Sequence, residues 1–339
     1  MKCIFCLGEK SGSEEHVFPL AIGGSLTMSR VCRDCNSFLG NNIDAALTNF
    51  APILWKRGEF GLAGNSGKAP SRFNIFDGEA KLAEDPDKRL KVRYNPTTEK
   101  FDISLIFHKR KVQLPNGTIA VQITVDAKER KNIPKIIQRE RKRQGMRSLT
   151  DEEMSQIIGS LEVQEGQQPT FIINPKINFA RLRHAMLKIV YELAFMWLGE
   201  TYLDDPSAAT IRAAILNPDS NETQFLMGSA GLIPEGNSSF KLWQLHPKHH
   251  LAYGIEIDGT IIIAIRIFDL LEATIPVTER AGRYISNMKV QNELRYLVID
   301  ATSGVTHDSS WLEEVIRVGQ LMSINGQLPP FPDPLASPP

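Results

Sequence analysis

The sequence predicts an α+β protein in which a small cysteine-bearing module precedes a larger mixed α+β region. All four cysteines lie within the first 35 residues, in two Cys-x-x-Cys pairs. Segments with strand-like alternation and segments with helical periodicity both follow in the rest of the chain. A length of 339 residues suits two or three domains of about 100–200 residues each.

The cysteine pairs indicate a metal site. Twenty-five residues separate the pair Cys3 and Cys6 from the pair Cys32 and Cys35. Two residues between cysteines allow one tight turn to present both sulfurs to the same ion, and four thiolates form the closed tetrahedral site typical of structural zinc. Four unliganded thiols are the alternative, which fits less well because every cysteine falls into a pair. We therefore expect a structural Zn²⁺, which by itself leaves the function open.

The residues between and after the cysteine pairs add a second pattern. Glu15 and His16 lie between the pairs, and Asn36 directly follows Cys35. An acid–histidine pair inside a CxxC…CxxCN frame resembles the HNH (ββα-metal) endonucleases, most closely the recombination endonuclease VII-like branch, over about residues 3–50. The resemblance implies a zinc-stabilised ββα-metal module, with a β-hairpin carrying the acid and the histidine and a helix behind it. It also implies metal-dependent hydrolysis of DNA, leaving 5′-phosphate and 3′-hydroxyl ends.

The same resemblance implies roles for three residues. His16 would be the general base, Glu15 a ligand of the catalytic metal, and Asn36 the second ligand through its amide oxygen. Glu15 stands where the family usually has Asp or His, and Gly40 stands where many members have a further ligand. Oxygen ligands favour Mg²⁺ or Mn²⁺ over softer metals.

The rest of the chain is predicted from periodicity and turn signals. We expect the nuclease module at 1–58, a linker at 59–70, an α+β region at 71–326 with two subdomains that separate near 127–176, and a disordered proline-rich tail at 327–339. Strands are expected at 73–76, 90–94, 101–107, 119–125, 240–245, 251–257, 260–268 and 294–299. Helices are expected at 36–50, from Thr150 onward, and at 178–198, 206–216 and 309–322.

Charge is balanced overall, with 39 basic and 39 acidic side chains, so a DNA-binding surface must come from local clustering. Between Lys128 and Arg147 nine Lys or Arg residues stand against two Glu residues. We expect phosphate contacts here, with a solvated helix face as the alternative. Within this segment we expect four residues to contact DNA, namely Arg139, Arg141, Lys142 and Arg143. Two other polar groups are expected to be exposed, namely Arg181, Arg183, His184 and Lys188 on one helix face and His246, His249 and His250 in a loop.

No apolar run approaches the 18–20 residues, roughly, that a membrane span needs, and no apolar signal segment follows Met1. We therefore expect a cytoplasmic protein without membrane contact, whose main partner is DNA. Two alternatives stay open. One is a non-catalytic zinc module that binds nucleic acid or a protein partner. The other is a regulated effector nuclease whose C-terminal region senses a ligand or a protein partner.

Overall fold

The computed structural model describes residues 1–113, 115–163, 170–173, 178–217, 228–233, 246–288 and 295–324. The chain forms two compact units. One unit combines residues 1–72 with residues 177–339, and the other is the segment 73–176 inserted between them. This division differs from the boundaries expected from the sequence, which separated the cysteine module from everything after residue 70. The strand expected at 240–245 and the proline-rich tail lie outside the described residues.

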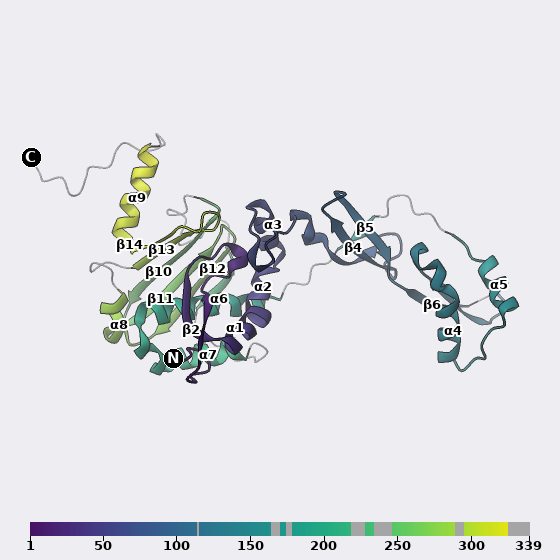
Figure 1. Ribbon diagram of the computed structural model, residues 1–339, viewed down its shortest axis with the longest axis horizontal. Coiled ribbons are helices and arrows are strands. Elements are labelled where there is room, and N and C mark those ends of the chain that lie inside the picture. Colours follow the sequence, from purple (N-terminus) through teal and green to yellow (C-terminus); the bar gives the residue numbers. More distant parts are fainter. Residues whose placement is uncertain are drawn as a thin grey trace, which may run out of the picture. The chain divides into compact units, whose positions relative to one another are not determined.

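The N-terminal part of the first unit contains two antiparallel strands followed by helices (Figure 1). The elements are β1 (Gly12–His16), β2 (Thr27–Cys32), α1 (Arg33–Leu39), a π-helical turn (Gly40–Asp44), α2 (Ala45–Thr48) and α3 (Ala51–Glu59). This segment packs its apolar side chains inward, since Leu39, Ile43 and Leu47 are fully inaccessible.

The C-terminal part of the same unit is built on a six-stranded antiparallel sheet in the order β14-β13-β10-β11-β12-β9. Its strands are β9 (Ser229–Leu232), β10 (His249–Ile257), β11 (Thr260–Ile267), β12 (Leu271–Thr278), β13 (Arg295–Asp300) and β14 (Thr306–Ser310). Its helices are α6 (Phe179–Leu198), α7 (Pro206–Leu216), α8 (Ala281–Met288) and α9 (Trp311–Ile324). The strands expected at 251–257 and 260–268 form a hairpin, and Asp258 and Gly259 both have positive φ in the turn between β10 and β11.

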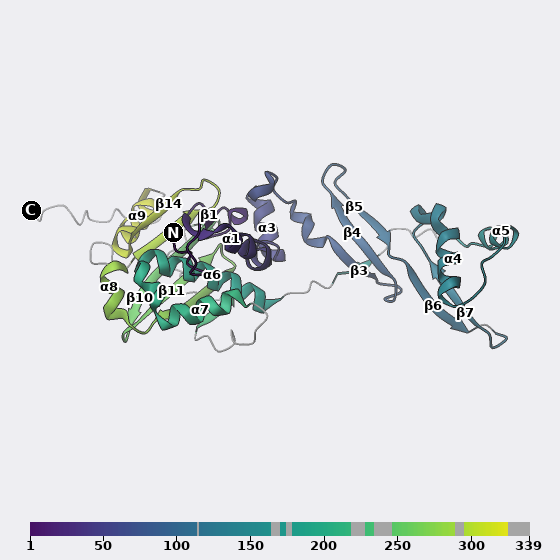
Figure 2. The same cartoon turned by 60° about the horizontal axis from the view of Figure 1, so that its bottom comes forward.

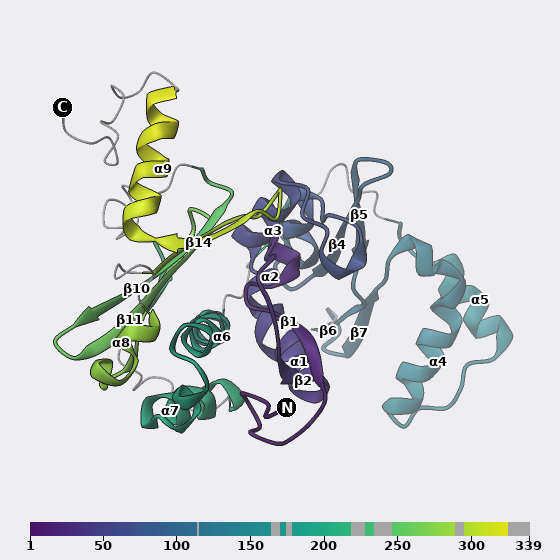
Figure 3. The same cartoon turned by 60° about the vertical axis from the view of Figure 1, so that its left-hand side comes forward.

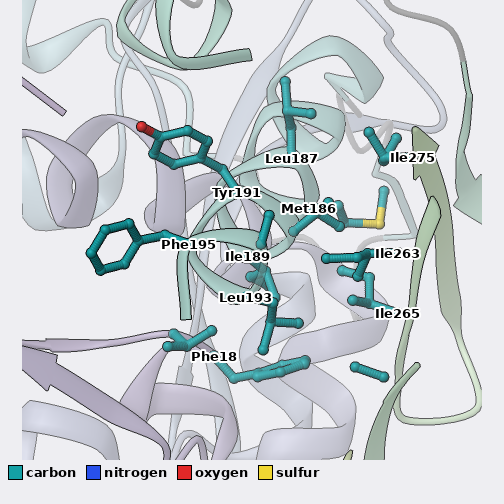
Figure 4. Close-up of a cluster of buried hydrophobic side chains, with 14 of the residues drawn as sticks. Phe18, Met186, Leu187, Ile189, Tyr191, Leu193, Phe195, Ile263, Ile265 and Ile275 are labelled. Carbon is teal, nitrogen blue, oxygen red and sulfur yellow. The ribbon is translucent and has the colours of Figure 1, made fainter. Parts of the chain in front are cut away.

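Helix α6 explains why the two parts form one unit. It begins at the N-cap Asn178 and ends before Gly199, as the sequence predicts. It lies between the large sheet and the β1–β2 hairpin (Figure 3), and residues 184–195 are buried without interruption. A helix that is buried on every face packs against neighbours on all sides. Figure 4 shows Phe18 of the N-terminal part in one cluster with side chains of α6 and with Ile263, Ile265 and Ile275 of the sheet.

Three buried side chains of the C-terminal part also donate hydrogen bonds to backbone carbonyls of the N-terminal part. The hydroxyl of Tyr191 donates to Ile4 (2.7 Å), the Lys188 ammonium to His16 (2.9 Å), and the His250 ring to Ile22 (2.8 Å). The expected linker is part of this core as well, because Leu62 is buried and Gly64 packs on Ala21. Residues 62 and 64 of the segment expected as a linker at 59–70 therefore contribute to this core.

The inserted unit contains a four-stranded sheet in the order β5-β4-β3-β8, a separate β6–β7 hairpin and two helices (Figure 2). The elements are β3 (Gly78–Leu82), β4 (Arg89–Asn95), β5 (Lys100–Leu105), β6 (His108–Gln113), β7 (Ile119–Thr124), α4 (Ile133–Arg143), α5 (Asp151–Gly159) and β8 (Phe171–Ile172). Residues 73–76 form a 3-10 turn in place of the expected strand. The predicted helix start at Thr150 is confirmed by a complete capping box with Glu153. Among the described residues, no helix is both long and apolar enough to cross a membrane.

Candidate active site

The four cysteines come together as a candidate zinc centre. Each offers a sulfur, and all four sulfurs lie within 4.8 Å of one another. Zn–S bonds of about 2.3 Å in a tetrahedron place sulfurs roughly 3.8 Å apart, so the cluster fits one Zn²⁺. Burial raises the pKa of the Cys3 thiol, but backbone N–H groups, including that of Cys32 at 3.4 Å, outweigh this effect and lower it to about 7. The first pair lies on the turn between Cys3 and Gly8, and the second spans the end of β2 and the start of α1.

His16 lies at the end of β1 with a defined ring orientation. Its Nδ1 donates a hydrogen bond to the carbonyl of Gly24 at 3.0 Å. The other ring nitrogen, Nε2, is therefore the unprotonated one in the neutral ring and can accept a proton. The side chain is one-quarter exposed, and Nε2 lies 3.8 Å from the exposed carboxylate of Glu14.

The loop that orients His16 requires glycine. A Cβ atom at Gly24 would lie 1.8 Å from the carbonyl oxygen of Phe18, and one at Gly23 would lie 2.2 Å from the carbonyl oxygen of Ala301. Gly23 also has a φ of 84°, which side-chain-bearing residues rarely adopt. These close backbone approaches bring the carbonyl of Gly24 to the imidazole of His16.

Asn36 joins α1 to the hairpin. Its side-chain nitrogen donates to the carbonyl of Glu14 at 2.7 Å and to the hydroxyl of Ser13 at 3.2 Å. Both bonds use the amide nitrogen. An open groove of about 590 Å³ adjoins the same residues and is lined by Met1, Gly12, Ser13, Glu14, Thr27, Met28 and Ser29.

Glu15 points away from this exposed surface. Its side chain is 4% exposed and its carboxylate lies 2.5 Å from the ammonium of Lys188 on α6. Asp44 and Glu192 complete a buried cluster around this ammonium, at 3.4 and 3.2 Å. Burial raises the pKa of Asp44 to about 6 and that of Glu192 well above its usual range. For Lys188, burial lowers the pKa, but Asp44, Glu192 and Glu15 together outweigh burial and raise it above the usual value.

The comparisons with known proteins identify the segment that carries this geometry. Residues 3–51 match the model of the HNH endonuclease family. The HNH segment, as we call residues 3–51 from here, contains all four cysteines and the β1–β2 hairpin, and it ends at the start of α3. No curated protein and no solved structure matches the chain.

The structure brings only some of the predicted site residues together. His16 and Asn36 both contact Glu14, whereas Glu15 lies on the opposite face of β1 in a bond to Lys188. The expectation that Lys188 and His184 are exposed is wrong, because they are 0% and 1% exposed. Lys188 is buried because Glu15 and Asp44 of the HNH segment pair with it, which periodicity within one helix cannot reveal. The acids at Glu15 and Asp44 lie more than 140 residues before Lys188 in the chain.

The four basic residues predicted to contact DNA lie at the C-terminal end of α4, in the inserted unit. We call Arg139, Arg141, Lys142 and Arg143 the α4 basic strip. The buried carboxylate of Glu140 pairs with Arg143 at 2.7 Å and with Lys109 of β6 at 2.8 Å. Arg141 is half-buried and donates to the carbonyl of Arg147, whereas the other three members are exposed. The strip therefore presents three accessible cations.

The prediction that His246, His249 and His250 lie in a loop is also partly wrong. His249 and His250 begin β10, and His250 is fully buried against Phe18 and Phe268.

Proposed function

We propose that the chain is a metal-dependent endonuclease that hydrolyses DNA phosphodiester bonds, with His16 as the general base. The observation that carries the proposal is the orientation of the His16 ring within the HNH segment. Its Nδ1 is engaged by Gly24, which directs the basic Nε2 toward the exposed side of the hairpin. A neutral imidazole held in one tautomer near pH 7 is a suitable base for activating water.

The proposed reaction transfers two protons and exchanges one bond. His16 Nε2 takes a proton from a water molecule as the water oxygen forms a bond to phosphorus. The bond from phosphorus to the 3′-oxygen breaks, and that oxygen takes up a proton from solvent. A divalent cation bound at this site would neutralise charge on the phosphoryl oxygens and on the leaving oxygen. The products are a 5′-phosphate and a 3′-hydroxyl.

The residues that would hold the cation are Asn36 and one of two neighbouring glutamates. The side-chain nitrogen of Asn36 is used by the hairpin, so its oxygen is the atom that can bind a cation. If Glu15 is a ligand, as predicted, its carboxylate must bind the cation and the Lys188 ammonium at the same time. Glu14 lies on the exposed side beside His16 and is the second candidate.

Two variants distinguish the glutamates. If Glu15 binds the cation, Glu15→Gln raises the Mn²⁺ concentration needed for half-maximal cleavage at least tenfold, and Glu14→Gln leaves it within about twofold. The reverse pattern assigns the cation to Glu14. If neither variant changes the metal dependence, both assignments are wrong.

The function itself is tested by incubating the full chain with supercoiled plasmid and Mg²⁺ or Mn²⁺. We expect nicked and linear products that DNA ligase can reseal, because ligase requires 5′-phosphate and 3′-hydroxyl ends. EDTA should abolish cleavage. If zinc-loaded protein leaves plasmid and linear DNA intact with either metal, the nuclease proposal fails and the non-catalytic zinc module becomes the better account.

A further inference from the structure

The most unusual group outside the proposed catalytic set is the ammonium of Lys188. It comes from the middle of α6, is fully buried, and lies within 3.4 Å of four oxygen atoms. A buried ammonium is costly unless it is paired and hydrogen-bonded. Here the partners belong to three different segments, namely β1, the π-helical turn before α2, and α6 itself.

The two shortest contacts of this ammonium go to consecutive residues of β1. They are the carboxylate of Glu15 at 2.5 Å and the backbone carbonyl of His16 at 2.9 Å. Side chains of adjacent strand residues point to opposite faces. By holding Glu15 inward and the carbonyl of His16 in place, Lys188 fixes the face of β1 on which the imidazole of His16 emerges.

We propose that Lys188 is a positioning residue for the general base. This inference rests on the proposed function of His16. The His16 ring is held at Nδ1 by Gly24, and its main chain is held by Lys188. A shift of about 1 Å in a catalytic group can reduce a rate by about 10²-fold. Lys188 belongs to the C-terminal part, so the HNH segment depends on α6 for the geometry of its own active site.

Glu192 provides a matched control within the same cluster. It lies one turn after Lys188 on α6 and pairs with the ammonium at 3.2 Å. Its contact in the cluster is with Lys188, whereas Lys188 also contacts β1. Glu192→Gln therefore removes a buried acid of the cluster and keeps the partners of Lys188 on β1, Glu15 and His16.

The experiment compares the parent protein with Lys188→Met, Glu192→Gln and the double variant Lys188→Met/Glu192→Gln. The double variant leaves fewer unpaired buried acids and keeps the test valid if Lys188→Met alone does not fold. Two readouts are used at a temperature well below each Tm. One is kcat and KM for cleavage of a DNA duplex with Mn²⁺. The other is the ring signals of His16 in ¹H–¹⁵N NMR spectra, assigned by their loss in His16→Ala.

We expect the Lys188 variants to lose about 10²-fold in kcat with KM within about threefold, and to shift the ring signals of His16. Glu192→Gln should retain both kcat and the parent signals. The proposal is overturned if the double variant folds with parent-like His16 signals and kcat, or if Glu192→Gln loses as much as Lys188→Met. If the parent cleaves nothing, the proposed function fails, and the NMR readout still decides whether Lys188 positions His16.

Discussion

The contact of His250 with the HNH segment makes the stability of the first unit sensitive to acid. The ring is fully buried, donates from Nε2 to the carbonyl of Ile22 at 2.8 Å, and accepts at Nδ1 from the N–H of Phe268 at 3.3 Å. A proton on Nδ1 would point at the N–H group of Phe268, so the charged ring could not accept this hydrogen bond. Burial lowers the pKa of His250 to about 4.

The sign and size of the effect follow from proton linkage. Between about pH 6.5 and pH 4 the unfolded chain binds a proton at His250 that the folded chain does not bind, so stability falls as the pH falls through this window and is constant above it. The full difference in pKa corresponds to about 3 kcal/mol, of which about 2 kcal/mol is lost between pH 7 and pH 5.

The perturbation that isolates this effect is His250→Gln, because glutamine keeps an N–H donor for Ile22 and does not titrate. Free energies of unfolding are measured for both proteins in urea at pH 7 and pH 5. Asp44 and Glu192, whose raised pKa values contribute with the opposite sign, are present in both proteins and cancel in the comparison. We expect the stability advantage of the parent over the variant to shrink by about 2 kcal/mol at pH 5. An advantage that is equal at the two pH values would refute the reasoning.

Three further predictions concern the zinc centre, the His16 loop and the inserted unit. Purified protein should hold one Zn²⁺ per chain by metal analysis, and Cys32→Ser should lower this zinc content. Because α6 shares its core with the HNH segment, Cys32→Ser should also lower hydrogen-exchange protection in α6 but not in β3–β5. Gly24→Ala should destabilise the chain by about 1–3 kcal/mol in urea titrations, since its Cβ would overlap the backbone of Phe18; an unchanged midpoint would contradict this. Neutralising the α4 basic strip should weaken DNA binding and reduce the salt slope by up to about three, one for each accessible cation, and an unchanged slope would favour a solvated helix face.

The sequence was sufficient for features that depend on local pattern. The cysteine spacing predicted a cluster that the structure brings together, and the periodicity of α6 predicted its limits. The strands expected at 251–257 and 260–268 likewise correspond to the β10–β11 hairpin. Each of these signals lies within a few residues, where spacing and backbone preference determine the outcome.

The parts that the sequence did not predict depend on contacts between distant segments. Lys188 looked like a surface residue because its helical neighbours include Arg181 and Arg183, and only the acids of the HNH segment make its burial favourable. For the same reason, the sequence does not show that Leu62 and the HNH segment share a core with α6, a helix that begins more than 100 residues later. The direction of Glu15 followed neither from its type nor from its position next to His16.

The most direct test of the account is the cleavage rate of His16→Ala under single-turnover conditions with Mn²⁺. The matched control is His307→Ala, which removes an exposed histidine of β14. The account predicts a loss of about 10²–10⁴-fold for His16→Ala, with zinc content and DNA affinity unchanged, and a parent-like rate for His307→Ala. A His16→Ala protein that cleaves DNA as fast as the parent would contradict it.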